Sequence, residues 1–172
     1  MSQDELVDIV DEKGNFIKVV SKQQAHEKGL LHKTVISQLV DSNGRWLLIK
    51  PSKGRQDEGQ YVSPMGGHVS AGETDVQALK REMNEELGLR GDFKYELIGK
   101  TIFNRFVIGR QENHFFIMYK SYSNKEPILS HEAESCKYFT EEELKRELKE
   151  NPELFGDAFH FVAKKFHPFL YE

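Results

Sequence analysis

Residues 67–89 read GHVSAGETDVQALKREMNEELGL, and this stretch decides the fold. Its second half contains neither proline nor glycine between Thr74 and Leu87, while Thr74 is a typical N-cap residue and Gly88 suits the position after a helix. The pattern predicts a helix over about residues 75–87. At about 100° per residue, one face of that helix is apolar and would pack on a core, through Val76, Leu79, Met83 and Leu87.

Three glutamates share a second face of this helix. Glu82, Glu85 and Glu86 fall within an arc of about 100°. Like charges at these spacings repel, so the cluster favours a bound cation. Carboxylate oxygens without a thiolate suit Mg²⁺ or Mn²⁺ better than zinc. The alternative is a solvated acidic stripe that binds nothing.

The loop before the helix contains groups that could approach a phosphate or a metal. Gly66 and Gly67 have no Cβ, so ligand oxygens can come close to their backbone. Glu73 precedes the helix and Arg81 lies within it, so the two could form a bidentate ion pair that fixes the loop to the helix. Arg81 could instead reach a phosphate; we favour the pairing with Glu73.

The spacing from Gly67 through Glu73 to Arg81 and onward to Leu89 resembles a complete Nudix box. The resemblance implies an α/β fold, a Nudix-type α/β/α sandwich with a mixed β-sheet, here preceded by an N-terminal β-hairpin. It also implies a Mg²⁺- or Mn²⁺-dependent hydrolase that cleaves a diphosphate linkage in a nucleoside-diphosphate-linked or similar small substrate. The metal ligands would be Glu82, Glu85, Glu86 and the Gly67 carbonyl, with Glu112 as a reserve ligand or base.

Roles for the remaining residues follow from this chemistry. Glu85 is the first candidate to accept the proton of the attacking water, and we group Arg81 and Glu73 with it as catalytic residues. The basic loop PSKGRQDEGQ could grip a distal phosphate, although it could also be a solvated surface loop. The predicted substrate-binding residues are Lys53, Arg55, Gly66, Gly67 and His68.

A narrower resemblance covers about residues 6–86 and points to the Nudix branch that includes isopentenyl diphosphate isomerase. It rests on the order of a hairpin, QAHEKGLLHKTV, SNGRWLLIKPSKG and GGHVSAGE. In the isomerases, histidines of such motifs help to bind a metal, which maps to His32 and His68, and with less support to His26. The alternative is that they are ordinary solvated or hydrogen-bonded histidines.

Two departures speak against the isomerase reaction. The isomerases carry a catalytic cysteine where this chain has Gly66, and an acidic residue where it has His114 after Glu112 and Asn113. Isomerisation needs an acid and a base on opposite faces of the substrate, and hydrolysis does not. We therefore favour hydrolysis, with isomerisation and a non-catalytic diphosphate-binding module as alternatives.

Composition sets broader limits. The 172 residues carry a net charge of −4, which disfavours nucleic-acid polymers and anionic membranes as partners and favours a small diphosphate substrate. A polar start, no long apolar run and the single Cys136 predict a cytoplasmic protein without an internal disulfide. Relatives in the family are often dimers, so a homodimer is a further option.

We expect one domain over residues 1–172, divided into a hairpin with a short helix (1–32), a core (33–139) and C-terminal helices (140–172). The expected strands are 6–10, 16–20, 34–40, 45–50, 93–103, 115–122 and 135–139. A short helix should end at Lys28. Thr140 should cap a helix that runs to Glu150, and Pro152 should open a second one that continues to about Phe166.

Overall fold

The computed structural model describes residues 5–172, so the first four residues of the polar start lie outside it. Within this range the chain forms an eight-stranded sheet and four α-helices. The strands are β1 Leu6–Val10, β2 Phe16–Ser21, β3 His32–Val40, β4 Trp46–Pro51, β5 Met65–His68, β6 Lys94–Val107, β7 Arg110–Tyr122 and β8 Ala133–Phe139. The helices are α1 Lys22–Lys28, α2 Asp75–Leu87, α3 Glu141–Glu150 and α4 Asp157–Phe166, with short 3₁₀ turns at Pro152–Leu154 and Pro168–Tyr171.

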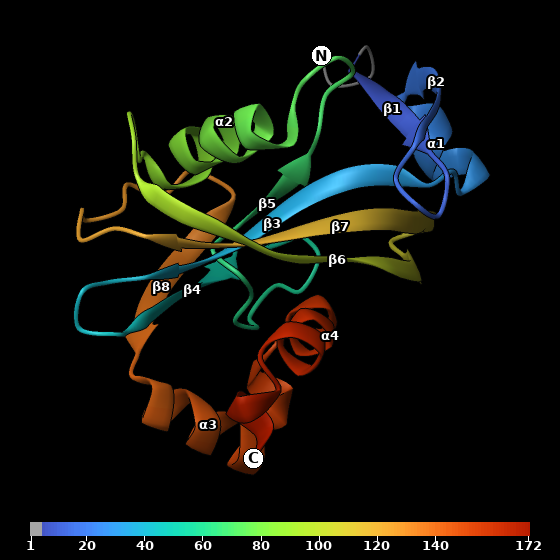
Figure 1. Cartoon of the computed structure of the whole chain (residues 1–172). Coiled ribbons are helices and arrows are strands. Elements are labelled where there is room, and N and C mark those ends of the chain that lie inside the picture. Colours follow the sequence, from blue (N-terminus) through green and yellow to red (C-terminus); the bar gives the residue numbers. More distant parts are fainter. Residues whose placement is uncertain (1–4) are drawn as a thin grey trace.

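Strand β3 is the centre of a mixed sheet. It runs parallel to β7 from the pair His32 and His114 to the pair Val40 and Tyr122, and antiparallel to β1, β4 and β5. Helix α2 lies over one face of the sheet and α4, with α3 beyond it, over the other (Figure 1). This arrangement confirms the predicted α/β/α sandwich with an N-terminal hairpin.

Alternation along β3 separates two apolar layers, because successive side chains of a strand point to opposite faces. Val35 and Leu39 pack with the apolar face of α2. Val40 packs with α3 and α4, and Ile36 with Val162 of α4. The α2 side contains the predicted core residues Leu79, Met83 and Leu87, each fully buried.

Helix α2 has the predicted bounds because both of its ends are capped. The Thr74 hydroxyl accepts from the Gln77 amide, and the Gln77 side chain accepts from the Thr74 amide in return. Gly88 ends the helix in the left-handed conformation, with φ of 65°, which glycine adopts without steric cost. The rigid helix fixes the direction in which its glutamates point.

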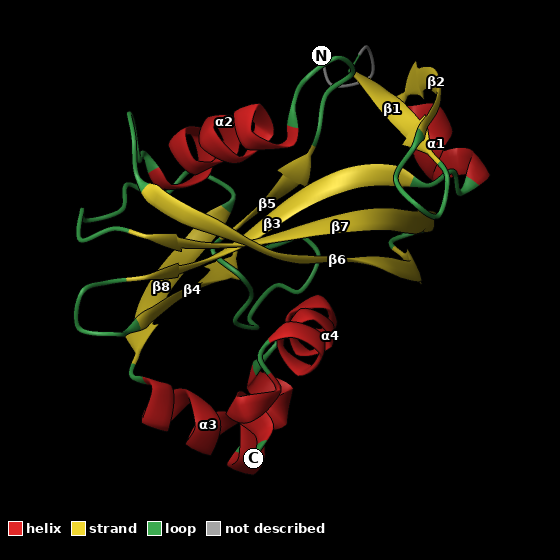
Figure 2. Cartoon of the chain, viewed as in Figure 1, coloured by secondary structure: helices red, strands yellow, loops and turns green. Residues whose placement is uncertain are grey.

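The hairpin and α1 form a small unit at one end of the sheet (Figure 2). The Ser21 hydroxyl accepts from the Gln24 amide at the start of α1, and Gly29 ends the helix with φ of 63°. These caps confirm the predicted short helix. It buries Ala25 and His26 against the rest of the chain.

The prediction of one helix from Pro152 to Phe166 is wrong. A 3₁₀ turn ends at Leu154, and the chain is then extended before α4 begins at Asp157. The Tyr61 amide donates to the Leu154 carbonyl over 2.7 Å, and the Gly156 amide donates to the Tyr61 carbonyl over 3.0 Å. These tertiary hydrogen bonds outweigh the helical periodicity of the segment.

Strands β6 and β7 are longer than predicted and meet at a tight turn that contains Gly109. Arg105, Glu112 and His114 lie on the paired ends of these two strands. In the part of the chain that the structure describes, no helix is long and apolar enough to cross a membrane.

Candidate active site

Arg81 is the centre of a network that joins α2 to the loop before it. Its Nε and Nη2 donate to the two Glu73 carboxylate oxygens over 2.8 and 2.9 Å. The same guanidinium donates to the Glu82 carboxylate over 2.7 Å and to the His68 carbonyl over 2.9 Å. The hydrogen bonds from Arg81 hold the pKa of Glu73 below its ordinary value. Arg81 therefore forms the expected bidentate pair with Glu73.

Gly67 lies directly against the carboxylate of Glu82. A Cβ on Gly67 would overlap the Glu82 carboxyl group, so no other residue fits without displacing it. Gly67 is held there by strand pairing with Val35 of β3. The backbone of β5 and the carboxylates of α2 consequently border one site.

Negative charge is concentrated next to Gly67. Burial raises the pKa of Glu82 to about 7, although the hydrogen bond from Arg81 opposes this shift. Burial also raises the pKa of Glu86, and the neighbouring Glu132 carboxylate raises it further. Crowded, partly buried carboxylates are stabilised by either a proton or a cation.

Glu85 is the most exposed of the three glutamates. Its side chain retains 56% exposure, and its ion pair among the described residues is a long one with Arg81, at 3.4 Å. It lines the same cleft as Gly67, Glu82 and Glu86. A carboxylate that is accessible and weakly held can accept a proton from a bound water.

Basic side chains also line this cleft. Its arginines include Arg105 and Arg110 of the β6–β7 hairpin. The Glu112 carboxylate accepts from Arg105 Nε over 3.1 Å and from Arg110 Nη2 over 2.6 Å. Arg105 Nη1 is buried and forms no hydrogen bond to the residues that the structure describes, and an Asp57 oxygen lies 3.7 Å away. The carboxylate of Glu112 thus orients two arginines.

The structure divides the predicted substrate-binding residues. Gly66, Gly67, His68 and Arg55 line the cleft, and the Arg55 guanidinium lies 3.0 Å from the Glu132 carboxylate. Lys53 lies on the exposed part of the basic loop and does not line the cleft. Glu112, predicted as a reserve metal ligand, lines the cleft, with its oxygens directed to arginines.

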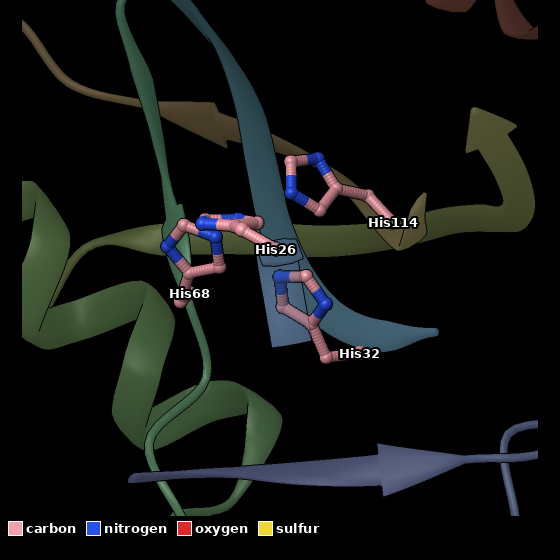
Figure 3. A group of neighbouring side chains, drawn as sticks. All are labelled: His26, His32, His68 and His114. Carbon is pink, nitrogen blue, oxygen red and sulfur yellow. The ribbon is translucent and has the colours of Figure 1, made fainter. Parts of the chain in front are cut away.

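Four histidines meet beside this cleft, from α1, β3, β5 and β7 (Figure 3). One candidate ligand atom from each of His26, His32, His68 and His114 lies within 4.8 Å of the others. The pairing of β3 with β7 places His32 opposite His114, and that with β5 places His68 opposite Thr34. Burial lowers the pKa of each of the four, which favours neutral imidazoles.

The domain model described as NUDIX domain matches residues 30–158, which is most of the chain. The chain belongs to the Nudix family. The matched residues include Glu73, Arg81 and the three glutamates of α2.

Named relatives fall into two groups. The chain is 28% identical over 164 residues to an isopentenyl-diphosphate Delta-isomerase of Serratia proteamaculans, covering 94% of this chain and 90% of that protein. It is 37% identical over 92 residues to an uncharacterized Nudix hydrolase of Nostoc, covering 52% and 54%. A crystal structure of a protein from Deinococcus radiodurans superposes with a TM-score of 0.72 at 21% identity, covering 93% of this chain and 98% of that one.

Sequence reasoning assigned no role to Glu132, Arg105 or Arg110. Glu132 precedes β8, far along the chain from α2, and nothing in its local sequence marks it. The two arginines sit at the ends of β6 and β7 that were predicted as loop. Their alternation with Glu112 around a glycine turn was the available signal for a hairpin that faces one cleft.

Proposed function

We propose that this Nudix protein is a Mg²⁺- or Mn²⁺-dependent hydrolase that cleaves the diphosphate linkage of a nucleoside-diphosphate-linked or similar small molecule. One observation carries the proposal: the carboxylates of Glu82, Glu85 and Glu86 line the same cleft as Arg55, Arg105 and Arg110. A diphosphate needs cations on more than one of its oxygens, and the arginines together with a metal on the carboxylates would supply them.

The donor set fits a hard divalent cation. The side chains that α2 offers here are the carboxylates of Glu82, Glu85 and Glu86, and the absence of a Cβ on Gly67 lets the Glu82 carboxylate lie directly against its backbone. The raised pKa values of Glu82 and Glu86 indicate uncompensated negative charge that a cation would neutralise. When bound, the metal supplies charge neutralisation of the diphosphate and a lowered pKa of a coordinated water.

The side chains around the cleft divide the remaining tasks. Glu85, accessible and weakly paired, accepts the proton of the attacking water. Arg81 and Glu73 are positioning residues, because their ion pair fixes Glu82 and the His68 carbonyl. Nη1 of Arg105, which has a long ion pair with Asp57 but no hydrogen bond to the described residues, is the candidate donor to a phosphate oxygen.

The experiment compares the wild-type protein with Glu86→Gln, each with Mg²⁺ or Mn²⁺. The panel contains nucleoside di- and triphosphates, nucleotide sugars, dinucleotides and isopentenyl diphosphate, and ³¹P NMR identifies the products. We expect the wild type to cleave at least one member and Glu86→Gln to lose turnover by about 100-fold or more while remaining folded.

Glu142→Gln is the matched control, since Glu142 is an exposed glutamate of α3 away from the cleft. It should retain wild-type turnover. Turnover by Glu86→Gln close to that of the wild type would contradict the assigned metal site, and no cleavage of any panel member would contradict the hydrolase.

Isomerisation of isopentenyl diphosphate is the second candidate, favoured by the likeness to the Serratia isomerase over nearly the whole chain. Gly66 carries no side chain to donate or accept a proton, and His114 replaces the acidic residue that the isomerase resemblance implies. The reaction would incorporate deuterium from D₂O into isopentenyl diphosphate. Lack of incorporation with metal present excludes it.

A non-catalytic module that binds a diphosphate without cleaving it is the third candidate. All the box glutamates are present, which gives this candidate the least support. It predicts thermal stabilisation by a diphosphate ligand without release of phosphate or pyrophosphate.

A further inference from the structure

A second cavity, of about 240 Å³, adjoins the cleft beside α2. We call it the side cavity. Gly66, Glu86 and Glu132 line both spaces, so the two are continuous. Most of the other side chains around the side cavity are apolar, among them Ile49, Val62, Met65 and Phe159. A substrate whose diphosphate lies at the α2 glutamates can therefore extend its organic group into this cavity.

Asp57 brings a carboxylate to the side cavity. Its side chain is only 11% exposed. Oδ1 accepts a hydrogen bond from Gln56 Nε2 over 3.1 Å, and Oδ2 lies 3.7 Å from Arg105 Nη1. Among the described residues, Oδ2 accepts no hydrogen bond. A carboxylate has about four lone-pair positions, so Asp57 can still accept from a ligand.

The backbone around Asp57 is arranged to hold this carboxylate in place. Asp57 has a φ of 62°, in the left-handed region that glycine adopts more easily than a residue with a side chain. Gly156 leaves room for the carboxyl group, since a Cβ there would lie 3.1 Å from Asp57 Cγ. Strained residues of this kind are concentrated at functional sites.

The surroundings of Asp57 distinguish between possible organic groups. An isopentenyl chain has no donor and would bury the carboxylate without a new partner. A cationic amine would be repelled by the nearby guanidinium of Arg105. The hydroxyls of a sugar need more polar partners than this mostly apolar lining offers. A neutral nucleobase fits, because its faces can pack on apolar side chains while its edge donates to Asp57.

Ser63 adds a hydrogen-bond donor to the side cavity. Its hydroxyl oxygen accepts from Nε2 of the fully buried Gln38 over 2.8 Å. The hydroxyl proton has no acceptor among the described residues, so it remains available to a ligand. A donor together with a carboxylate acceptor suits a base edge that carries both kinds of group. Guanine has such an edge, with a carbonyl oxygen followed by a ring N–H and an amino group.

We propose that Asp57 determines which organic group the substrate carries, and that this group is a nucleobase with an amino group next to a ring N–H, as in guanine. Each oxygen of the carboxylate accepts one of these two donors. The inference rests on the proposed function in one respect, which is that the diphosphate lies at the glutamates of α2.

The test compares three nucleoside diphosphates that differ only at the base. Inosine diphosphate (IDP) lacks the amino group of guanosine diphosphate (GDP), and xanthosine diphosphate (XDP) has a carbonyl in its place. Isothermal titration calorimetry measures Kd on the full-length protein with Ca²⁺ instead of Mg²⁺, and ³¹P NMR checks that the probes stay intact. We expect the wild type to bind GDP about 10-fold or more tightly than IDP, because without the amino group the buried carboxylate loses a partner.

Two variants of Asp57 separate its chemistry from its effect on folding. Asp57→Gly adopts the positive φ without strain and should bind GDP and IDP equally. Asp57→Asn offers one donor and one acceptor, so it should prefer XDP to GDP. Glu58→Gln changes an exposed neighbour that lines neither space and should keep the wild-type preference. Circular dichroism checks that each variant is folded.

The proposal is overturned if the wild type binds none of the three probes, binds GDP and IDP equally, or binds isopentenyl diphosphate more tightly than GDP. It is also overturned if Asp57→Gly keeps the preference for GDP. Cleavage that depends on Glu86 but shows no preference among bases would contradict the role of Asp57 and leave the hydrolase intact. A preference for GDP that depends on Asp57, without cleavage of any substrate in Mg²⁺, would support the role of Asp57 and contradict the hydrolase.

Discussion

The backbone of Gly67 touches the carboxylate of Glu82, and the space between β5 and α2 admits no Cβ. Gly67→Ala should displace Glu82 and reduce the stabilisation that Mg²⁺ gives, at a cost of about 1–3 kcal/mol in unfolding free energy. Thermal melts with and without Mg²⁺ measure both effects. In Gly66→Ala the new Cβ meets the Ile36 side chain at 3.3 Å and the Val35 carbonyl at 3.8 Å, and neither is a box carboxylate, so the Mg²⁺ effect should persist. Equal Mg²⁺ stabilisation of the two variants would show that the contact is not needed.

Arg81→Lys tests the network between the loop and α2. Lysine keeps the charge but cannot form the bidentate pair with Glu73 and also reach the His68 carbonyl. Because Arg81 is partly exposed, we expect a loss of only about 1–2 kcal/mol in urea unfolding. Turnover should fall more, by about 100-fold, because Glu82 loses its fixed position.

A loss of stability without a loss of turnover would contradict the positioning role of Arg81. Lys80→Arg is the matched control on the same helix. The Lys80 ammonium pairs with the exposed Asp92, 3.2 Å away, and has no contact with the box carboxylates. This substitution should change neither quantity by a measurable amount.

The capped helix α2 was predictable because its start, end and apolar face are all encoded locally. The same holds for α1 between Ser21 and Gly29. The break before α4 was not predictable, since it depends on hydrogen bonds to Tyr61, a residue distant in sequence. The apolar periodicity of this segment indicates which side chains are buried, not the backbone conformation that buries them. Phe155 is buried although its backbone is extended.

In the candidate site, too, some features were predictable from local sequence and others depend on distant parts of the chain. The spacing of the box indicates that Glu73, Arg81 and Glu82 belong together, and the structure places them in one network. Glu132 lies beside Glu86 because of the path that the chain takes before β8, so no local sequence pattern predicts this contact. His114 stood out in the sequence as a missing acid, and only the pairing of β7 with β3 shows which three imidazoles it joins.

As pH rises, the metal-free protein should lose stability, while the additional stability that Mg²⁺ gives should increase. Burial raises the pKa of Glu82 to about 7 and also raises that of Glu86, above the ordinary value of about 4.3 in an unfolded chain. The protonated carboxyls therefore contribute full stability below about pH 4.3, and this contribution is lost as pH rises through about 7. Metal binding requires the deprotonated forms, so stabilisation by Mg²⁺ should grow over the same rise.

Melting temperatures between pH 6.5 and 8.5 test this dependence, because the ordinary histidine pKa of about 6.5 lies at the edge of that range. The metal-free protein should lose stability across it, and the shift produced by Mg²⁺ should increase. Glu82→Gln removes one titrating ligand and should flatten both curves. A Mg²⁺ shift that falls as pH rises would contradict the assignment of these carboxylates as ligands.

Glu132→Gln tests the charge next to Glu86. Removing this carboxylate should lower the pKa of Glu86 toward its ordinary value and stabilise the metal-free protein at pH 8. Both side chains of the lost ion pair between Arg55 and Glu132 are partly exposed, so its loss should lower the free energy of unfolding only slightly. Glu134→Gln, an exposed neighbour on β8, is the control and should leave the pH dependence unchanged. Destabilisation by Glu132→Gln at pH 8 would show that its pairing with Arg55 outweighs the repulsion.

Arg105→Ala tests substrate recognition by the arginines that line the cleft. Among the described residues the buried Nη1 of Arg105 has no hydrogen-bond partner and only a long ion pair with Asp57, at 3.7 Å, so a phosphate oxygen can accept from it without breaking an existing hydrogen bond. A hydrogen bond between charged groups contributes about 1.5–3 kcal/mol, which corresponds to an increase in KM of about 10- to 100-fold. The change should fall mainly on KM, because Arg105 binds the substrate and takes no part in proton transfer. Arg45→Ala removes an arginine that pairs with Asp41 in a turn away from the cleft and should leave KM unchanged. An unchanged KM in Arg105→Ala would place the substrate phosphates elsewhere in the cleft, with Arg55 and Arg110 as the remaining arginines to examine.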